Sequence, residues 1–203
     1  MSAAAMMRLL PWVLALGMPA GNACAQLRAT PVTVSNVAYE LEGYSILPPQ
    51  GGDWFELKRD PQTVFFGKKI ASRTHAFIAT AMSAPISGKF ETPEAFREYI
   101  SRVLPLRGDG RHRVIENRVE MDNALGRFCV KYHTKAEDRD APYAQGITLL
   151  AETFGVTCLH PENPQLNISV SYTERGNPAE TSAELRAEGE RFVRSLKFTP
   201  HRP

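Results

Sequence analysis

Polar and apolar residues alternate along 166–173. The apolar positions hold Leu166, Ile168, Val170 and Tyr172. The polar positions between them hold Asn167, Ser169, Ser171 and Thr173. Because successive side chains of a strand point to opposite faces, this alternation predicts a strand in a sheet with one apolar side.

Other apolar runs, rich in β-branched and aromatic residues, predict further strands. They lie at 44–47, 54–59, 63–67, 74–84, 113–122, 126–135 and 146–159. Between the first two stands PPQGGDW, whose glycines permit positive φ. A phosphate-binding loop would need a helix after the glycines, whereas a strand is predicted here, so we expect a corner between two strands.

Two segments have helical periodicity instead. In the first, Thr92 suits an N-cap and Pro93 suits the first helical position, before apolar residues spaced three or four apart. In the second, Thr181 and Glu184 form a capping box. An apolar face follows it, and Gly189 would allow that helix to approach the sheet closely.

Successive strands without a helix after each one predict an antiparallel β-sheet flanked by helices, in an α+β domain. The sequence shows no internal repeat and no change of composition after residue 43. We expect 1–25 to be a signal peptide, 26–43 a partly flexible lead-in, and 44–203 a single α+β domain.

The first 25 residues have the pattern of a secretory signal peptide. Arg8 gives a positive start, an apolar stretch follows, and residues 23–25 form a small-x-small cleavage site. That stretch is too short to span a bilayer, which takes about 20 residues. We expect export to the periplasm or the extracellular space. A second interpretation stays open, in which Cys24 is lipidated and tethers the domain to a membrane.

Cleavage after Ala25 would leave two cysteines, Cys129 and Cys158, in predicted strands on either side of a turn-like segment. If these strands form a hairpin centred near residues 143 and 144, opposed residues have numbers that add to about 287, as 129 and 158 do. We therefore predict a structural disulfide between Cys129 and Cys158.

Several stretches resemble the PsbP-like superfamily. They are YSILPPQGGDW, ETPEAFREYI as the first helix, ENRVEMDNALGRFCVKYH as a strand–turn–strand, and GERFVRSLKF as the closing helix and strand. The resemblance as a whole extends over roughly residues 42–199. The resemblance implies an α/β/α sandwich around an antiparallel sheet, and binding or scaffolding rather than catalysis. It implies no catalytic residue.

Composition and motifs exclude several classes of function. With 24 Lys and Arg against 22 Asp and Glu, nothing favours nucleic acid as a partner. The chain lacks a G-x-S-x-G elbow, a dinucleotide glycine signature and zinc-like spacing of histidines. We expect no catalytic residue, no cofactor and no metal. The acidic stretch at 136–141 contains Arg139, so a solvated hairpin end is expected there rather than a cation site.

The densest basic run is RGDGRHR, and its Arg107, Arg111 and Arg113 are the candidate interaction patch, which would face an anionic surface or a phosphate. We expect a non-enzymatic binding or interaction module of the cell envelope, with a protein or an envelope component as partner. A periplasmic small-ligand-binding protein, with a pocket between the sheet and a helix, is the alternative. An enzyme of unrecognised type is the third interpretation.

Overall fold

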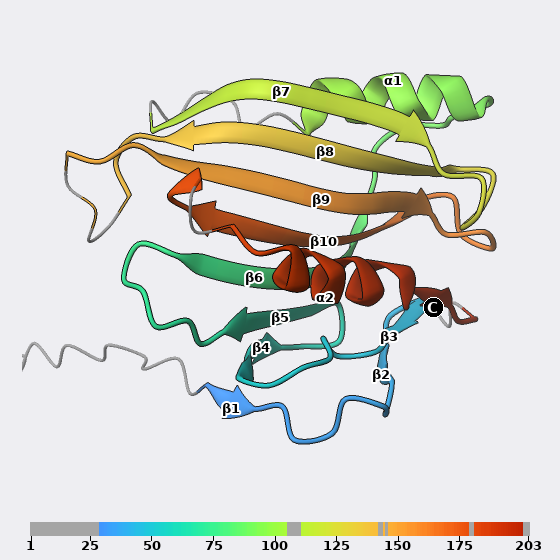
Figure 1. The fold of residues 1–203 in the computed structure, drawn as a ribbon. Coiled ribbons are helices and arrows are strands. Elements are labelled where there is room, and N and C mark those ends of the chain that lie inside the picture. The colour runs from blue at the N-terminus through green and yellow to red at the C-terminus, as the bar shows by residue number, and fades with distance from the viewer. Residues whose placement is uncertain (1–28, 105–110, 142–143, 145, 179–180, 201–203) are drawn as a thin grey trace, which may run out of the picture.

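A computed structural model describes residues 29–104, 111–141, 144, 146–178 and 181–200, which form two antiparallel sheets and two helices (Figure 1). The eight-stranded sheet has the order β1-β4-β5-β6-β10-β9-β8-β7, and the three-stranded sheet has the order β11-β3-β2. The strands are β1 Thr30–Pro31, β2 Tyr39–Leu41, β3 Tyr44–Ile46, β4 Trp54–Arg59, β5 Thr63–Lys68, β6 Ala76–Pro85, β7 His112–Met121, β8 Cys129–Asp138, β9 Leu149–Leu159, β10 Leu166–Gly176 and β11 Lys197–Phe198. The helices are α1 Pro93–Val103 and α2 Ala183–Arg194.

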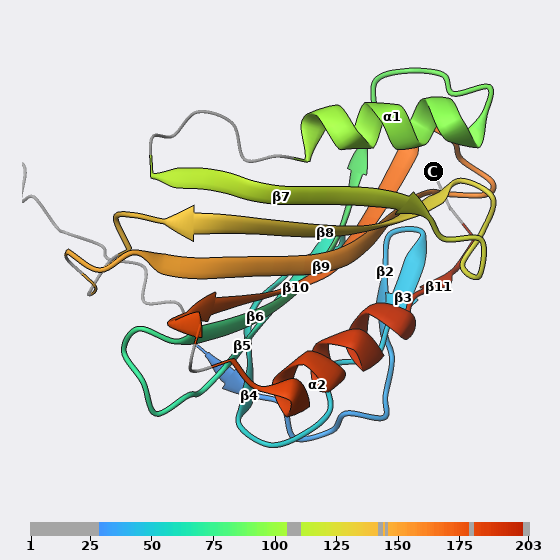
Figure 2. The same ribbon diagram turned by 45° about the horizontal axis from the view of Figure 1, so that its top comes forward.

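The predicted α+β fold with an α/β/α sandwich is wrong, because the described residues form mostly strands, with two short helices that cannot cover the sheets as layers. Helix α2 packs on β10, β6 and β9, and α1 lies along β7 at the edge of the sheet (Figure 2). A helix is about 10 Å wide, whereas eight strands spaced about 4.8 Å apart span about 34 Å. One helix on a face therefore covers about three strands, and the fold is dominated by its sheets.

The larger core lies on the face of the eight-stranded sheet that carries α2, which we call the α2 face. Trp54, Phe77 and Tyr172 are almost fully buried there. The centroid of the Phe77 ring lies 5.7 Å from that of Trp54 and 5.7 Å from that of Tyr172. Helix α2 approaches this layer closely through Gly189, as predicted. A Cβ on Gly189 would lie 2.6 Å from Cδ1 of Tyr172, so only glycine leaves room for the ring.

Helix α1 confirms the helix predicted from the sequence. The Thr92 side chain caps it by accepting a hydrogen bond from the Ala95 N–H, at 3.2 Å. Phe96 and Ile100 are buried in a second, smaller core against β8 and β9. The second helix begins one residue later than predicted. Ser182, not Thr181, is its N-cap, and the Ser182 hydroxyl accepts from the N–H of Leu185.

Strands β8 and β9 form the predicted hairpin ladder. Cys129 lies opposite Cys158 in the register, and a disulfide joins them. The same register brings His133 opposite Phe154, as the numbering of the hairpin indicated. The turn between these strands includes residues outside the described part of the chain.

The stretch PPQGGDW is a corner between β3 and β4, as predicted, and it also covers a buried ion pair. Gly51 has a φ of 107°, and a Cβ there would lie 2.6 Å from the Glu188 carboxylate. That carboxylate accepts hydrogen bonds from Lys68 Nζ at 2.6 Å and from the indole N–H of Trp54 at 2.8 Å. The absence of a side chain at Gly51 therefore leaves room for the buried carboxylate of Glu188 on α2.

The two outer strands of the large sheet differ in length. Strand β1 has two residues, while β7 has ten and carries charged side chains together with a register shift between Val114 and Glu116. Strands β1 and β2 both come from the segment expected to be a lead-in. The proposed division of the chain into leader, lead-in and single domain stays a prediction, and the leader lies outside the described residues.

Candidate functional site

A groove of about 450 Å³ runs on the α2 face between α2 and strands β7–β9. We call it the α2 groove. Its helix wall includes Glu190 and Arg194, its strand wall includes Arg118 and Lys131, and its floor includes His133, Phe154 and Tyr172. The wall on α2 arises from helical spacing, because residues four apart lie on the same side of a helix.

The floor of the α2 groove is a row of aromatic rings on three neighbouring strands. His133 and Phe154 stack with their centroids 4.1 Å apart and their planes at 5°. Phe154 and Tyr172 stack at 5.2 Å and 20°. Cross-strand pairing of alternate residues places the three rings on one face, so the sheet itself holds them in one continuous stack.

Charged side chains form the rim of the groove, and Arg118, Lys131 and Arg194 each have an acidic partner. Arg118 Nε lies 2.6 Å from Glu116. Lys131 Nζ lies 3.0 Å from Glu120. Arg194, on the helix wall, reaches Asp122 at 2.5 Å, and its Nη1 donates that hydrogen bond. The rim is thus charged with both signs around an apolar floor.

Two buried polar atoms of the floor have no hydrogen-bond partner among the described residues. They are the hydroxyl of Tyr172 and Nε2 of His133. Burial, and after it the nearby Glu190 carboxylate, raise the pKa of the Tyr172 hydroxyl, which therefore stays protonated at neutral pH. A buried hydroxyl without a partner costs free energy, and a bound group could recover it.

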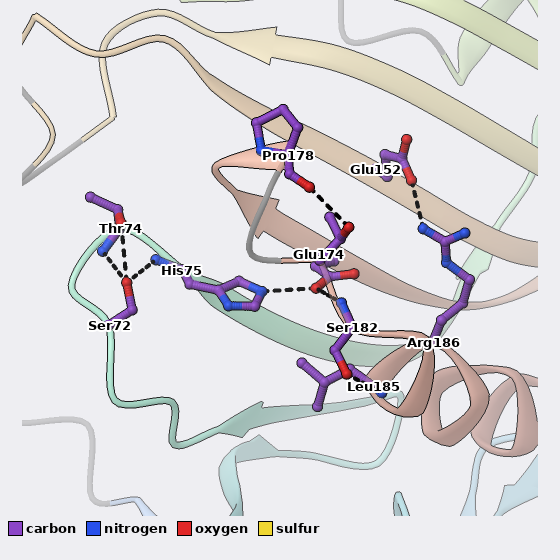
Figure 3. A network of polar contacts seen from close by, with 10 residues as sticks. Ser72, Thr74, His75, Glu152, Glu174, Pro178, Ser182, Leu185 and Arg186 are labelled. Atoms are coloured by element: carbon purple, nitrogen blue, oxygen red, sulfur yellow. Dashed lines mark hydrogen bonds and ion pairs between the residues drawn. The ribbon is translucent and has the colours of Figure 1, made fainter.

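A polar network holds the first turn of α2 against the sheet (Figure 3). Nε2 of His75 lies 2.8 Å from Oε1 of Glu174, and the same oxygen accepts from the backbone N–H of Ser182 at 3.2 Å. Arg186 donates to Glu152 at 3.2 Å, and its guanidinium lies 5.3 Å from the centre of the Phe154 ring. These contacts fix the helix wall, so the groove is preformed.

The predicted basic patch does not line the groove. Arg111 donates two hydrogen bonds to Asp138, at 2.6 and 2.7 Å, and Arg113 forms a similar pair with Glu137. Arg107 lies outside the described residues. Hydrogen bonds from Arg113 and then Arg139 lower the pKa of Glu137 to about 2. The basic run and the acidic stretch thus pair with each other, which the sequence alone did not indicate.

Within the described part of the chain, no cluster of three or more His, Cys, Asp or Glu is placed to hold a metal ion. The helices described there are also too short or too polar to cross a membrane. His160, which follows the disulfide, is buried; its Nδ1 accepts backbone N–H groups of Glu162 and Asn163, and its Nε2 contacts the Thr199 carbonyl at 2.8 Å. The absence of a cofactor stays a prediction.

Sequence reasoning missed the groove, apart from the approach of His133 to Phe154. One signal was available, since Arg186, Glu190 and Arg194 recur every four residues beside the apolar face of α2. It could not show that aromatic rings of the sheet lie beneath that row.

Comparison with known proteins finds matches among solved structures only. No family model and no curated protein matches the chain. One similar solved structure is the Ran-binding protein Mog1p of Saccharomyces cerevisiae, with 7% identity and a TM-score of 0.43 over 79% of this chain and 95% of that chain. Another is a point mutant of protein Mog1, with 9% identity and a TM-score of 0.45 over 81% of this chain and 96% of that one. Similarity at this level says nothing about function.

Two predictions are corrected by these findings. The resemblance to the PsbP-like superfamily is not upheld: no family model matches the chain, and the similar solved structures named above are Mog1 proteins. The predicted periplasmic, extracellular or lipid-anchored location is not borne out either: the solved structures named above are a Ran-binding protein and a Mog1 mutant, and neither is described as exported. The signal peptide and Cys24 lie outside the described residues.

Proposed function

We propose that this chain is a non-enzymatic protein-binding module whose partner docks in the α2 groove. The observation that carries the proposal is the buried Tyr172 hydroxyl, which has no hydrogen-bond partner among the described residues although it belongs to the floor of a preformed groove. Buried polar groups in folded proteins normally have a partner, so this atom suggests an incomplete site.

The surroundings of the groove favour a protein over a small molecule. An apolar, aromatic centre inside a charged, solvated rim is the usual anatomy of a protein interface, where a few aromatic anchors carry most of the binding energy. Arg118 and Arg194 stand on opposite walls, and Glu120 and Glu190 accompany them. A partner with both signs of charge around its anchor would complement this rim.

The partner's anchor is an aromatic side chain. The His133, Phe154 and Tyr172 rings form one continuous stack, so an aromatic side chain of the partner can pack against it at little cost in conformational entropy. The described residues that line the groove include no serine, threonine or cysteine to act as a nucleophile. This composition supports binding rather than catalysis.

Site-specific photo-crosslinking tests the proposal. A benzophenone amino acid replaces Glu190 in one protein and Glu184 in another; Glu184 is exposed on α2 but does not line the groove. In extract of the source cells, we expect the probe at 190 alone to crosslink one protein through a segment with an aromatic residue. Excess unmodified chain should compete, and a folded Phe154→Ala chain should not.

Three results would contradict the proposal. One is equal crosslinking from both positions, and another is equal competition by the Phe154→Ala chain. The third is a groove that crosslinks to no protein.

A further inference from the structure

The opposite face of the eight-stranded sheet has a hollow of about 370 Å³, independent of the α2 groove. It exists because neighbouring strands carry small side chains there. The floor consists of Ala76, Ala151, Thr134, Thr153 and Thr173. Taller side chains, among them Ile78, Tyr132 and Leu104, surround this floor. We call the hollow the Arg175 pocket, after the arginine at its polar end.

The polar end of the Arg175 pocket is formed by charged side chains. Asp138 is fully buried there and accepts two hydrogen bonds from Arg111. Arg175 adds a longer contact, with Nη1 at 3.4 Å from Asp138 Oδ2. Two guanidinium groups thus share one carboxylate. Nε of Arg175 is buried and has no hydrogen-bond partner in the described part of the chain.

Hydroxyl groups add further donors beside Arg175. The hydroxyls of Thr153 and Thr173 lie 2.9 Å apart on adjacent strands, and either one can donate to the other. A single hydrogen bond uses one of their two protons, so the second remains available to an acceptor in the pocket. Thr134 differs, because its hydroxyl donates to Asn117 at 3.0 Å.

The rest of the pocket is apolar. Ile78 is 40% exposed on β6, Ala76 lies two residues before it on the same strand, and Leu104 also lines the pocket. A guanidinium with an unused N–H binds carboxylates well, and an apolar wall favours a hydrocarbon chain. The volume falls near the lower end of the range of about 300–1,000 Å³ that is usual for small-molecule sites.

We propose that the Arg175 pocket binds a small amphipathic monocarboxylate. Its carboxylate lies against Nε of Arg175 and the free hydroxyl proton of the Thr153–Thr173 pair, and its hydrocarbon chain lies along Ala76 and Ile78. This ligand would complete the hydrogen bonding of Arg175. The inference does not depend on the proposed protein partner, because the two sites lie on opposite faces of the sheet.

Calorimetry with octanoate tests the inference on the whole folded chain. We expect saturable binding of octanoate, and no detectable binding of octanamide or inorganic phosphate at the same concentrations. Arg175→Gln should weaken octanoate binding about tenfold or more, because a charged hydrogen bond is lost. The octanoate affinity of Arg175→Lys should lie between that of the wild type and that of Arg175→Gln. Arg113→Gln is the matched control, since Arg113 forms an exposed ion pair outside the pocket and its loss should leave the affinity unchanged.

Amide chemical shifts provide a second readout that does not depend on the arginine variants. Octanoate should shift the amide signals of Thr153 and Thr173 and leave those of Glu190 and Arg194 in α2 unchanged. Equal binding of octanoate and octanamide would overturn the inference. So would an affinity unchanged by Arg175→Gln, shifts confined to the α2 groove, or no binding of octanoate up to millimolar concentrations.

Discussion

Replacing Gly189 with alanine should destabilise the protein, although alanine is the better helix former. In an exposed helix interior, glycine to alanine stabilises by about 1 kcal/mol. Gly189, however, is buried against Tyr172, and a Cβ would lie 2.6 and 2.7 Å from Cδ1 and Cδ2 of its ring. Overpacking of this kind costs about 1–3 kcal/mol.

The Tyr172 ring has little freedom to move away. Phe77 stacks on it at 5.7 Å and Phe154 at 5.2 Å, each with an interplanar angle of 20°. We therefore take the upper end of the overpacking cost, about 3 kcal/mol, and subtract the gain in helix propensity. The expected loss is about 2 kcal/mol in the free energy of unfolding, or about 4–8 °C in Tm for a chain of this size.

Urea denaturation followed by far-UV circular dichroism measures this loss. A double-mutant cycle isolates its cause, because Gly189→Ala should cost much less in a Tyr172→Leu background, where the ring is absent. If Gly189→Ala stabilised the protein, or cost the same in both backgrounds, the close packing of α2 on Tyr172 would be refuted.

Three further predictions concern the interior. Replacing Cys129 and Cys158 with alanine should reduce the free energy of unfolding by about 3–4 kcal/mol on the chain-entropy model, measured by urea denaturation, and an unchanged midpoint would contradict it. Lys68→Met leaves the carboxylate of Glu188 buried without its cation and should lower the free energy of unfolding by about 3–5 kcal/mol. Adding Glu188→Gln should restore part of this stability. If the effects of the two substitutions were purely additive in the double variant, the reasoning would be contradicted. Hydrogen bonds from an arginine hold the pKa of Asp138 below its usual value, so its stabilising effect exists above about pH 4 and disappears as the pH falls. The stability difference between wild type and Asp138→Asn should therefore narrow on acidification, and a constant difference would argue against this pairing.

Local features of the fold were predictable because each depends on residues close in sequence. The cap at Thr92 and the alternation along 166–173 each specify one element. The pairing of Cys129 with Cys158 also followed, because a hairpin has a single register once its centre is chosen. The sandwich did not follow, because periodicity shows that a helix has an apolar face but not how much of a sheet it covers.

The sites depend on contacts between distant residues, and for this reason the sequence did not reveal them. Arg111 belongs to a basic run in the sequence, but the pairing of β7 with β8 places it beside Asp138, 27 residues away. The α2 groove joins Glu190 to rings on β8 and β9, and the Arg175 pocket is a gap between side chains of five strands and the end of α1. Neither arrangement has a local pattern.

The long outer strand β7 has a consequence for how copies of this protein behave at high concentration. An open sheet exposes backbone groups at its edge, where a second molecule can add its own strand and begin a fibril. Glu116, Arg118 and Glu120 place charged side chains along this strand, and the register shift after Val114 interrupts the regular ladder that such pairing requires. The strand that forms one wall of the groove thus also carries two features that disfavour edge-to-edge association.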